Sequence, residues 1–96
     1  MASSWWLRCE VLPGPFDTER VVVLHEMTRG KTLQIIVDRE LVQSDEPPSQ
    51  GRPVAGRVRV LRSGDVSGQT NVLLPVPSAE FGSIIAVPAA ELVAAG

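Results

Sequence analysis

The sequence predicts an all-β domain, a small barrel of about six strands, and three observations lead to this prediction. Apolar and polar residues alternate with a period of two in several segments, which places successive side chains on opposite faces of a strand. Valine is the commonest residue, and β-branched side chains favour pleated strands. Most of the eight prolines and eight glycines fall between the alternating segments, where they end strands and form turns.

The first strand is predicted over residues 5–11. Its odd positions are apolar and are expected to face the core: Trp5, Leu7, Cys9 and Val11. Its even positions are expected on the outer face: Trp6, Arg8 and Glu10. Pro13 and Pro15 end the strand, because proline has no N–H to donate to a neighbouring strand.

A hairpin follows, with strands predicted over residues 19–27 and 32–37. Three consecutive valines followed by Leu24 favour the first of these strands, and Gly30 in the turn can supply the positive φ of a tight connection. In the strand over residues 19–27, the alternation is interpreted as placing four residues toward the core: Val21, Val23, His25 and Met27. This interpretation puts Val22 and Leu24 on the outer face.

The second half of the chain predicts three more strands, over residues 54–61, 70–76 and 83–87. Pro75 lies inside the second of them and indicates a bulge or a sheet edge, because it cannot complete a ladder of hydrogen bonds. Residues 44–53 are polar, rich in proline and without periodicity, so they are predicted to be a linker between the halves.

The two halves share one plan. Each is predicted to have three strands followed by a short helical turn, which starts near Asp38 in the first half and near Pro88 in the second. With an offset of 51 residues, Glu40-Leu41-Val42 aligns with Glu91-Leu92-Val93. The chain, 1–96, is therefore interpreted as one domain of two β-β-β-turn pseudo-repeats, about 5–43 and 54–95, with chance similarity as the alternative. Closing such a sheet would remove its edges and make an SH3-like or OB-like barrel.

The composition excludes several classes of protein. The net charge of −2 and a hydrophobic content of 44 % argue against a disordered chain and against one built mainly to hold nucleic-acid phosphates. A single cysteine cannot form an internal disulfide. No apolar run approaches the ~20 residues that span a bilayer, and the charged first ten residues are a poor signal peptide. We expect a soluble cytoplasmic protein that does not bind membranes.

Catalytic and metal-binding residues are scarce. A structural zinc site takes four nitrogen or sulfur ligands, and this chain offers only Cys9 and His25 of those types. Both are predicted to face the core, Cys9 as a small buried apolar residue and His25 as a structural histidine. No phosphate-binding glycine motif is present, and the paired carboxylates fall in turns and the linker. The sequence therefore predicts no enzyme activity and no cofactor.

Three arginines suggest an alternative function. Arg57 and Arg59 are two residues apart on a strand, so their side chains point the same way about 7 Å apart, close to the phosphate spacing of a nucleic-acid strand. With Arg62 and the aromatic ring of Trp6, they could hold single-stranded RNA or DNA on a small barrel. The competing interpretation is a solvated strand face whose arginines pair with acids across the sheet.

Apolar residues on the outer face lead to the main functional prediction. Six are assigned there: Trp6, Val22, Leu24, Ile36, Leu61 and Leu73. Contiguous exposed apolar surface usually marks a contact with another molecule, unless the faces are wrongly assigned or loops cover them. The sequence predicts a non-enzymatic interaction module that self-associates or docks in a larger protein assembly. Its candidate interaction surface comprises Trp6, Arg8, Leu24, Arg57, Arg59 and Arg62.

Overall fold

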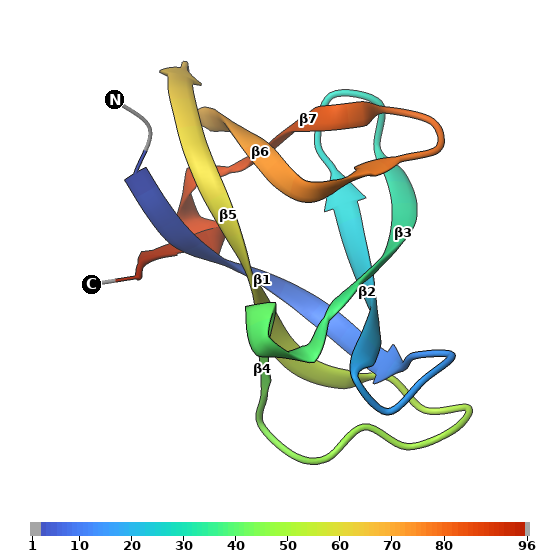
Figure 1. Ribbon diagram of the computed structural model, residues 1–96. Helices are drawn as coiled ribbons and strands as arrows, with labels where there is room; N and C mark the ends of the chain where they lie inside the picture. Colours follow the sequence, from blue (N-terminus) through green and yellow to red (C-terminus); the bar gives the residue numbers. More distant parts are fainter. Residues whose placement is uncertain (1–2, 96) are drawn as a thin grey trace.

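The computed structural model describes residues 3–95, which form one antiparallel sheet curled into a half-barrel (Figure 1). Along the sheet the strands run in the order β3-β2-β1-β5-β6-β7, while short strands β4 and β8 pair with β5 and β1. The strands are β1 (Ser3–Pro13), β2 (Glu19–Glu26), β3 (Lys31–Asp38), β4 (Val42–Ser44), β5 (Val54–Val66), β6 (Gln69–Ser78), β7 (Gly82–Pro88) and β8 (Leu92–Ala94). The all-β prediction is confirmed, and β4 and β8 are two short strands that it did not include.

Two isolated turns of 3-10 helix, η1 (Arg39–Leu41) and η2 (Ala89–Glu91), confirm the predicted helical turns. Each turn directly precedes one of the short strands. None of the helical segments among residues 3–95 is long and apolar enough to cross a membrane.

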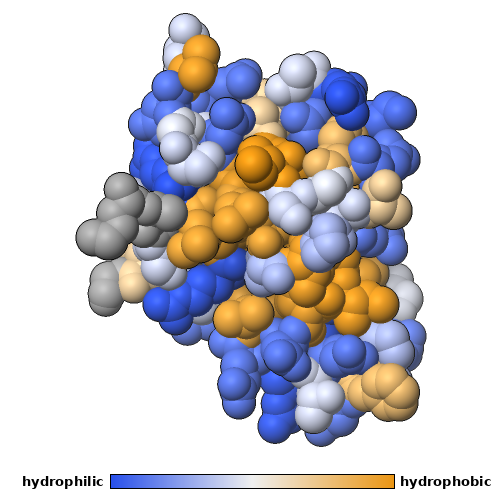
Figure 2. All heavy atoms as spheres, turned by 45° about the horizontal axis from the view of Figure 1, so that its top comes forward, coloured by the Kyte–Doolittle hydropathy of each residue, from blue (hydrophilic) through white to orange (hydrophobic). Residues whose placement is uncertain are grey.

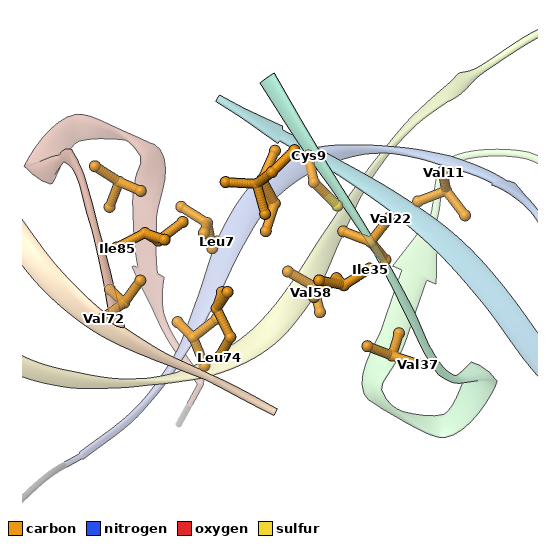
Figure 3. Packing of buried hydrophobic residues seen from close by; sticks show 14 of the residues in the cluster. Leu7, Cys9, Val11, Val22, Ile35, Val37, Val58, Val72, Leu74 and Ile85 are labelled. Carbon is orange, nitrogen blue, oxygen red and sulfur yellow. The ribbon is translucent and has the colours of Figure 1, made fainter. Parts of the chain in front are cut away.

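The core lies on the concave side of the sheet. Alternation in β1 places Leu7, Cys9 and Val11 inside, as predicted, and Figure 3 shows these side chains directed at residues of the opposite strands. β5 and β6 contribute through the same period of two. The fully buried members of the cluster include Val22, Leu24, Val58, Val72 and Val87.

The predicted faces of β2 were wrong. Val22 and Leu24 face the core, with Leu24 only 1 % exposed, while His25 and Met27 are exposed. In an unbroken run of apolar residues, either the odd or the even positions could face the core. The register with the neighbouring strand therefore decides which of them do. The register places Val22 opposite Val11, and residues directly opposite each other on antiparallel strands share a face. Leu24 therefore does not belong to the outer face, contrary to the prediction.

The two halves of the chain have the same order of elements. β1-β2-β3-η1-β4 is followed by β5-β6-β7-η2-β8. Each half also adds its last short strand to the other half. β4 of the first half pairs with β5 of the second, and β8 of the second half pairs with β1 of the first. Descent of the halves from one duplicated unit stays a prediction.

Two contacts join the β2–β3 hairpin to the β6–β7 hairpin across the curled sheet. The main-chain N–H of Met27, after β2, donates a hydrogen bond of 2.9 Å to the carbonyl of Ala86 in β7. Lys31 forms an ion pair with Glu80 at 3.7 Å. The β6–β7 register shifts between Leu73 and Ser78, which confirms the irregularity predicted from Pro75.

Candidate interaction surface

The outer face of β1 and β5 brings four of the predicted surface residues together. The register pairs Trp6 with Arg59 and Arg8 with Arg57, so these four side chains share one face. The guanidinium carbons of Arg57 and Arg59 lie 5.2 and 5.7 Å from the centroid of the Trp6 ring, within the range of cation–π contacts. We call Trp6, Arg8, Arg57 and Arg59 the Trp–Arg patch.

The hydrogen-bond partners of two of these arginines are neutral. Arg57 Nε donates to Gln43 Oε1 at 2.9 Å, and Arg59 Nε donates to Ser4 Oγ at 2.7 Å. Neither forms an ion pair with an acidic side chain of the described residues. The interpretation of these two arginines as cross-strand partners of acids is therefore wrong.

Charge is concentrated at the centre of the patch. Arg8 and Arg57 stand directly opposite each other, and like charges in that position destabilise a sheet. Glu91 is the acidic neighbour, at 3.6 Å from Arg8 Nε, in an ion pair that is largely exposed to solvent. Trp6, Arg8 and Arg57 line a depression of about 630 Å³, whose acidic residues are Asp45 and Glu91. The patch thus keeps positive charge that its own neighbours compensate only in part.

Arg62 does not belong to this patch. It is three residues beyond Arg59, and an odd separation on a strand reverses the face. Its guanidinium lies 4.4 Å from the centroid of the Trp5 ring and donates two hydrogen bonds to Asp65, of 3.1 and 2.9 Å. The hydrogen bonds from Arg62, and then the one from Thr70, lower the pKa of the Asp65 carboxyl. Arg62 holds the end of the β5–β6 hairpin.

An apolar row continues the outer face beyond the patch. Leu61 of β5 stands opposite Leu73 of β6, which stands opposite Ile84 of β7. Leu61 and Ile84 are 39 % and 55 % exposed. We call Leu61, Leu73 and Ile84 the β5–β7 row; it begins two residues from Arg59 on the same face. The sequence interpretation had assigned Leu61 and Leu73 to the outer face and missed Ile84, which the pairing with Leu73 identifies.

A second apolar row crosses the same outer face, on the half of the sheet formed by β1, β2 and β3. Leu12, Val21 and Ile36 are opposite one another on β1, β2 and β3. Ile36 is exposed, as predicted, whereas the other two are half-buried. Figure 2 shows apolar side chains gathered in a band across one face of the molecule, with hydrophilic residues on both sides. Exposed apolar surface of this kind is typical of proteins that contact other molecules.

Cys9 and His25 lie on opposite faces of the sheet and form no dyad. Burial, and then the negative charge of Glu10, raise the pKa of the Cys9 thiol to about 12, so the nucleophilic thiolate is suppressed. Cys9 is buried as predicted. His25 is exposed, contrary to prediction, with Nδ1 3.2 Å from Thr32 Oγ1 and Nε2 3.7 Å from Glu10 Oε1. Across residues 3–95, no three His, Cys, Asp or Glu side chains are placed together to hold a metal ion.

Comparison with known proteins identifies no relative. No family model matches the chain. No curated protein and no solved structure matches it either.

Proposed function

We propose that this protein is a non-enzymatic interaction module whose outer sheet face docks an acidic segment of a protein partner. The observation that carries the proposal is the Trp–Arg patch, in which Arg8 is opposite Arg57 and two arginines contact Trp6 with neutral hydrogen-bond partners only. A carboxylate placed among these guanidiniums would relieve their repulsion and accept charge-assisted hydrogen bonds. Tryptophan and arginine are also the residues that most often dominate binding energy at protein interfaces.

The β5–β7 row supplies the apolar part of the same surface. Leu61 lies about 7 Å along β5 from Arg59, so a partner that reaches the arginines can also cover the row. An acidic segment with interspersed apolar side chains matches this combination. If the partner is a second copy of the chain, the same surface accounts for the predicted self-association.

A binding titration tests the proposal. A labelled peptide of alternating glutamate and leucine is titrated with the protein, next to the same peptide with glutamine in place of glutamate. We expect the acidic peptide to bind more tightly and its affinity to fall with added salt. Arg57→Gln with Arg59→Gln should weaken it by about 5-fold or more, from the loss of two charged contacts. Arg39→Gln is the matched control, because Arg39 is exposed and paired with Asp17 away from the patch.

Equal affinity for the acidic and the neutral peptide would contradict the proposal. So would a loss of binding in the Arg39→Gln control as large as that in the patch variant. Sedimentation of the protein alone, with Ile84→Asp as the comparison, separates self-association from docking of a different partner. A protein that sediments as a monomer with and without the substitution excludes self-association through this surface.

Single-stranded nucleic acid is the second candidate ligand. Arg57 and Arg59 project from one face about 7 Å apart beside Trp6, and phosphates along a strand have a similar spacing. Binding of single strands usually uses several aromatic rings on which bases stack. Phe16, the most exposed aromatic residue among residues 3–95, lies in the β1–β2 loop and not on the strand face that carries Trp6. Tight binding of a short oligothymidine that weakens steeply with salt, and is lost with Arg57→Gln, would favour this candidate instead.

A further inference from the structure

The wall of the half-barrel is split beside the middle of β1. On one edge, β1 pairs with β8 over residues 5–7 and with β2 over residues 10–13, so Arg8 and Cys9 have no registered partner there. The carbonyl of Ser4 accepts a hydrogen bond from Ala95, and the N–H of Gly14 donates to Glu19, both across this edge at 3.2 Å. The N–H and C=O groups of successive residues in a strand point to alternate edges. Because Ser4 and Gly14 point to this edge, Arg8, an even number of residues from both, also points its N–H and C=O to this edge, into the split.

A pocket of about 410 Å³ occupies the split. Buried core residues form its floor, each no more than 6 % exposed: Leu7, Cys9, Leu24 and Val87. Met27 and Pro88 add apolar walls from the end of β2 and the end of β7. This volume is in the range of pockets that hold small organic ligands, and an apolar interior with a few polar groups is typical of them.

The charged groups around the pocket carry a negative excess. Three carboxylates line it, those of Glu10, Glu26 and Glu91, against the single guanidinium of Arg8 and the imidazole of His25. Arg8 is paired with Glu91 at 3.6 Å, whereas the partner of Glu10 is His25, which is charged only when protonated. The Glu26 carboxylate accepts main-chain hydrogen bonds from Thr28 and Arg29 at 3.1 and 2.7 Å. Glu10 is therefore the carboxylate least compensated by its neighbours.

We propose that this pocket binds a small organic cation, a primary amine attached to an apolar body. The apolar body would lie against Met27 and Pro88, the solvent-accessible apolar walls of the pocket, where it displaces water from apolar surface. The ammonium has three N–H donors, and the Glu10 carboxylate and the main-chain carbonyl of Arg8 offer acceptors at the rim. The site adjoins the Trp–Arg patch, because Arg8, Ala55 and Glu91 border both depressions.

A titration followed by NMR tests this inference with three probes of one skeleton. Phenethylamine carries the cation, phenethyl alcohol is neutral, and phenylacetate is an anion. We expect saturable shifts of the Leu7, Leu24 and Val87 methyl signals with the amine at millimolar concentration. The alcohol should bind more weakly and the carboxylate weakest, because the rim is negatively charged.

The rim carboxylate is then removed with its shape retained. Glu10→Gln should weaken binding of the amine by about 2- to 5-fold, the range for partly exposed charge pairs, and leave binding of the alcohol unchanged. Glu80→Gln is the matched control, an exposed carboxylate paired with Lys31 and absent from the pocket lining. Equal affinity for all three probes, shifts that do not saturate, or equal effects of the two substitutions would overturn the inference.

Discussion

Leu7 of β1 and Val58 of β5 face each other at the centre of the sheet, and they occupy equivalent positions of the two halves, 51 residues apart. The register of β1 with β5 is symmetric about this pair, since Trp6 opposite Arg59 corresponds to Arg57 opposite Arg8. Leu7 and Val58 also mark where the exchanged strands attach, because Leu7 pairs with Leu92 of β8 and Val58 with Val42 of β4. A local two-fold relationship therefore describes the β1–β5 pairing. The attached strands depart from it by one residue, because Leu92 corresponds to Leu41 whereas Val58 pairs with Val42.

Removing a side chain at this centre should be costly. Leu7 is 1 % exposed, so Leu7→Ala is expected to lower the free energy of unfolding by about 2 to 5 kcal/mol through lost burial and a residual cavity. The matched variant is Leu61→Ala on the outer face, which should change stability by less than about 1 kcal/mol. Urea denaturation of the two variants measures the difference, and equal losses would be inconsistent with the assigned faces.

Gly56 should tolerate no side chain. A Cβ atom there would lie 2.5 Å from the carbonyl oxygen of Gln43 and 2.7 Å from Val11 Cγ2, because β4 crosses close to β5. Gly56→Ala is expected to destabilise the fold by about 1 to 3 kcal/mol, the range for overpacking. Gly64→Ala is the control in the same strand, with nothing within 4 Å of the added atom. Thermal unfolding should show a loss for the first variant only.

The carboxylate of Glu26 should make stability depend on acid pH. Burial alone would raise its pKa, but hydrogen bonds from Arg29, Thr28 and Ala86 outweigh burial and lower the pKa below the ordinary value of 4.5. Because the folded pKa is the lower one, this contribution is complete above the unfolded pKa and is lost as pH falls through the folded pKa. Urea titrations at neutral and acid pH should show a smaller pH dependence for Glu26→Gln than for the unmodified protein. Glu80→Gln, at an exposed position, should leave the pH dependence unchanged.

Glu26→Gln should also lower stability at neutral pH. An amide has one acceptor oxygen in place of two, so one of the two partly buried hydrogen bonds is lost, at about 0.5 to 1.5 kcal/mol. The loss should centre on the β2–β3 turn and on its contact with β7, where amide hydrogen exchange can be followed residue by residue. Equal protection of these amides from exchange in Glu26→Gln and in the unmodified protein would contradict the role of Glu26 as the link between these elements.

The Cys9 thiol should be unreactive in the folded protein. With its pKa raised to about 12, chiefly by burial, it stays protonated at pH 8, and only the thiolate reacts with iodoacetamide. Mass spectrometry should detect little alkylation under native conditions and complete alkylation in guanidinium chloride. Rapid native modification would show that the split beside β1 opens and exposes the thiol.

Part of the candidate surface was predictable from sequence and part was not. Alternation in β1 predicts an outward Trp6 and Arg8, and the two-residue spacing predicts that Arg57 and Arg59 point together. That these pairs lie side by side depends on the register between strands that are distant in the sequence. Arg59 and Arg62 are three residues apart, an odd spacing that places Arg62 on the face opposite Arg59. In the structure Arg62 contacts Trp5, whereas Arg59 contacts Trp6.

The sequence by itself determined the strands, the turns and the inner face of β1, because a period of two and the conformational limits of proline and glycine act over a few residues. It did not determine the face of β2, where Val21, Val22, Val23 and Leu24 satisfy either alternation. Only the tertiary structure decided that Leu24 is buried, that His25 is exposed and that the Trp–Arg patch exists. Strand register is a non-local choice, made by packing across the sheet, and it assigns every side chain of a strand to one face or the other.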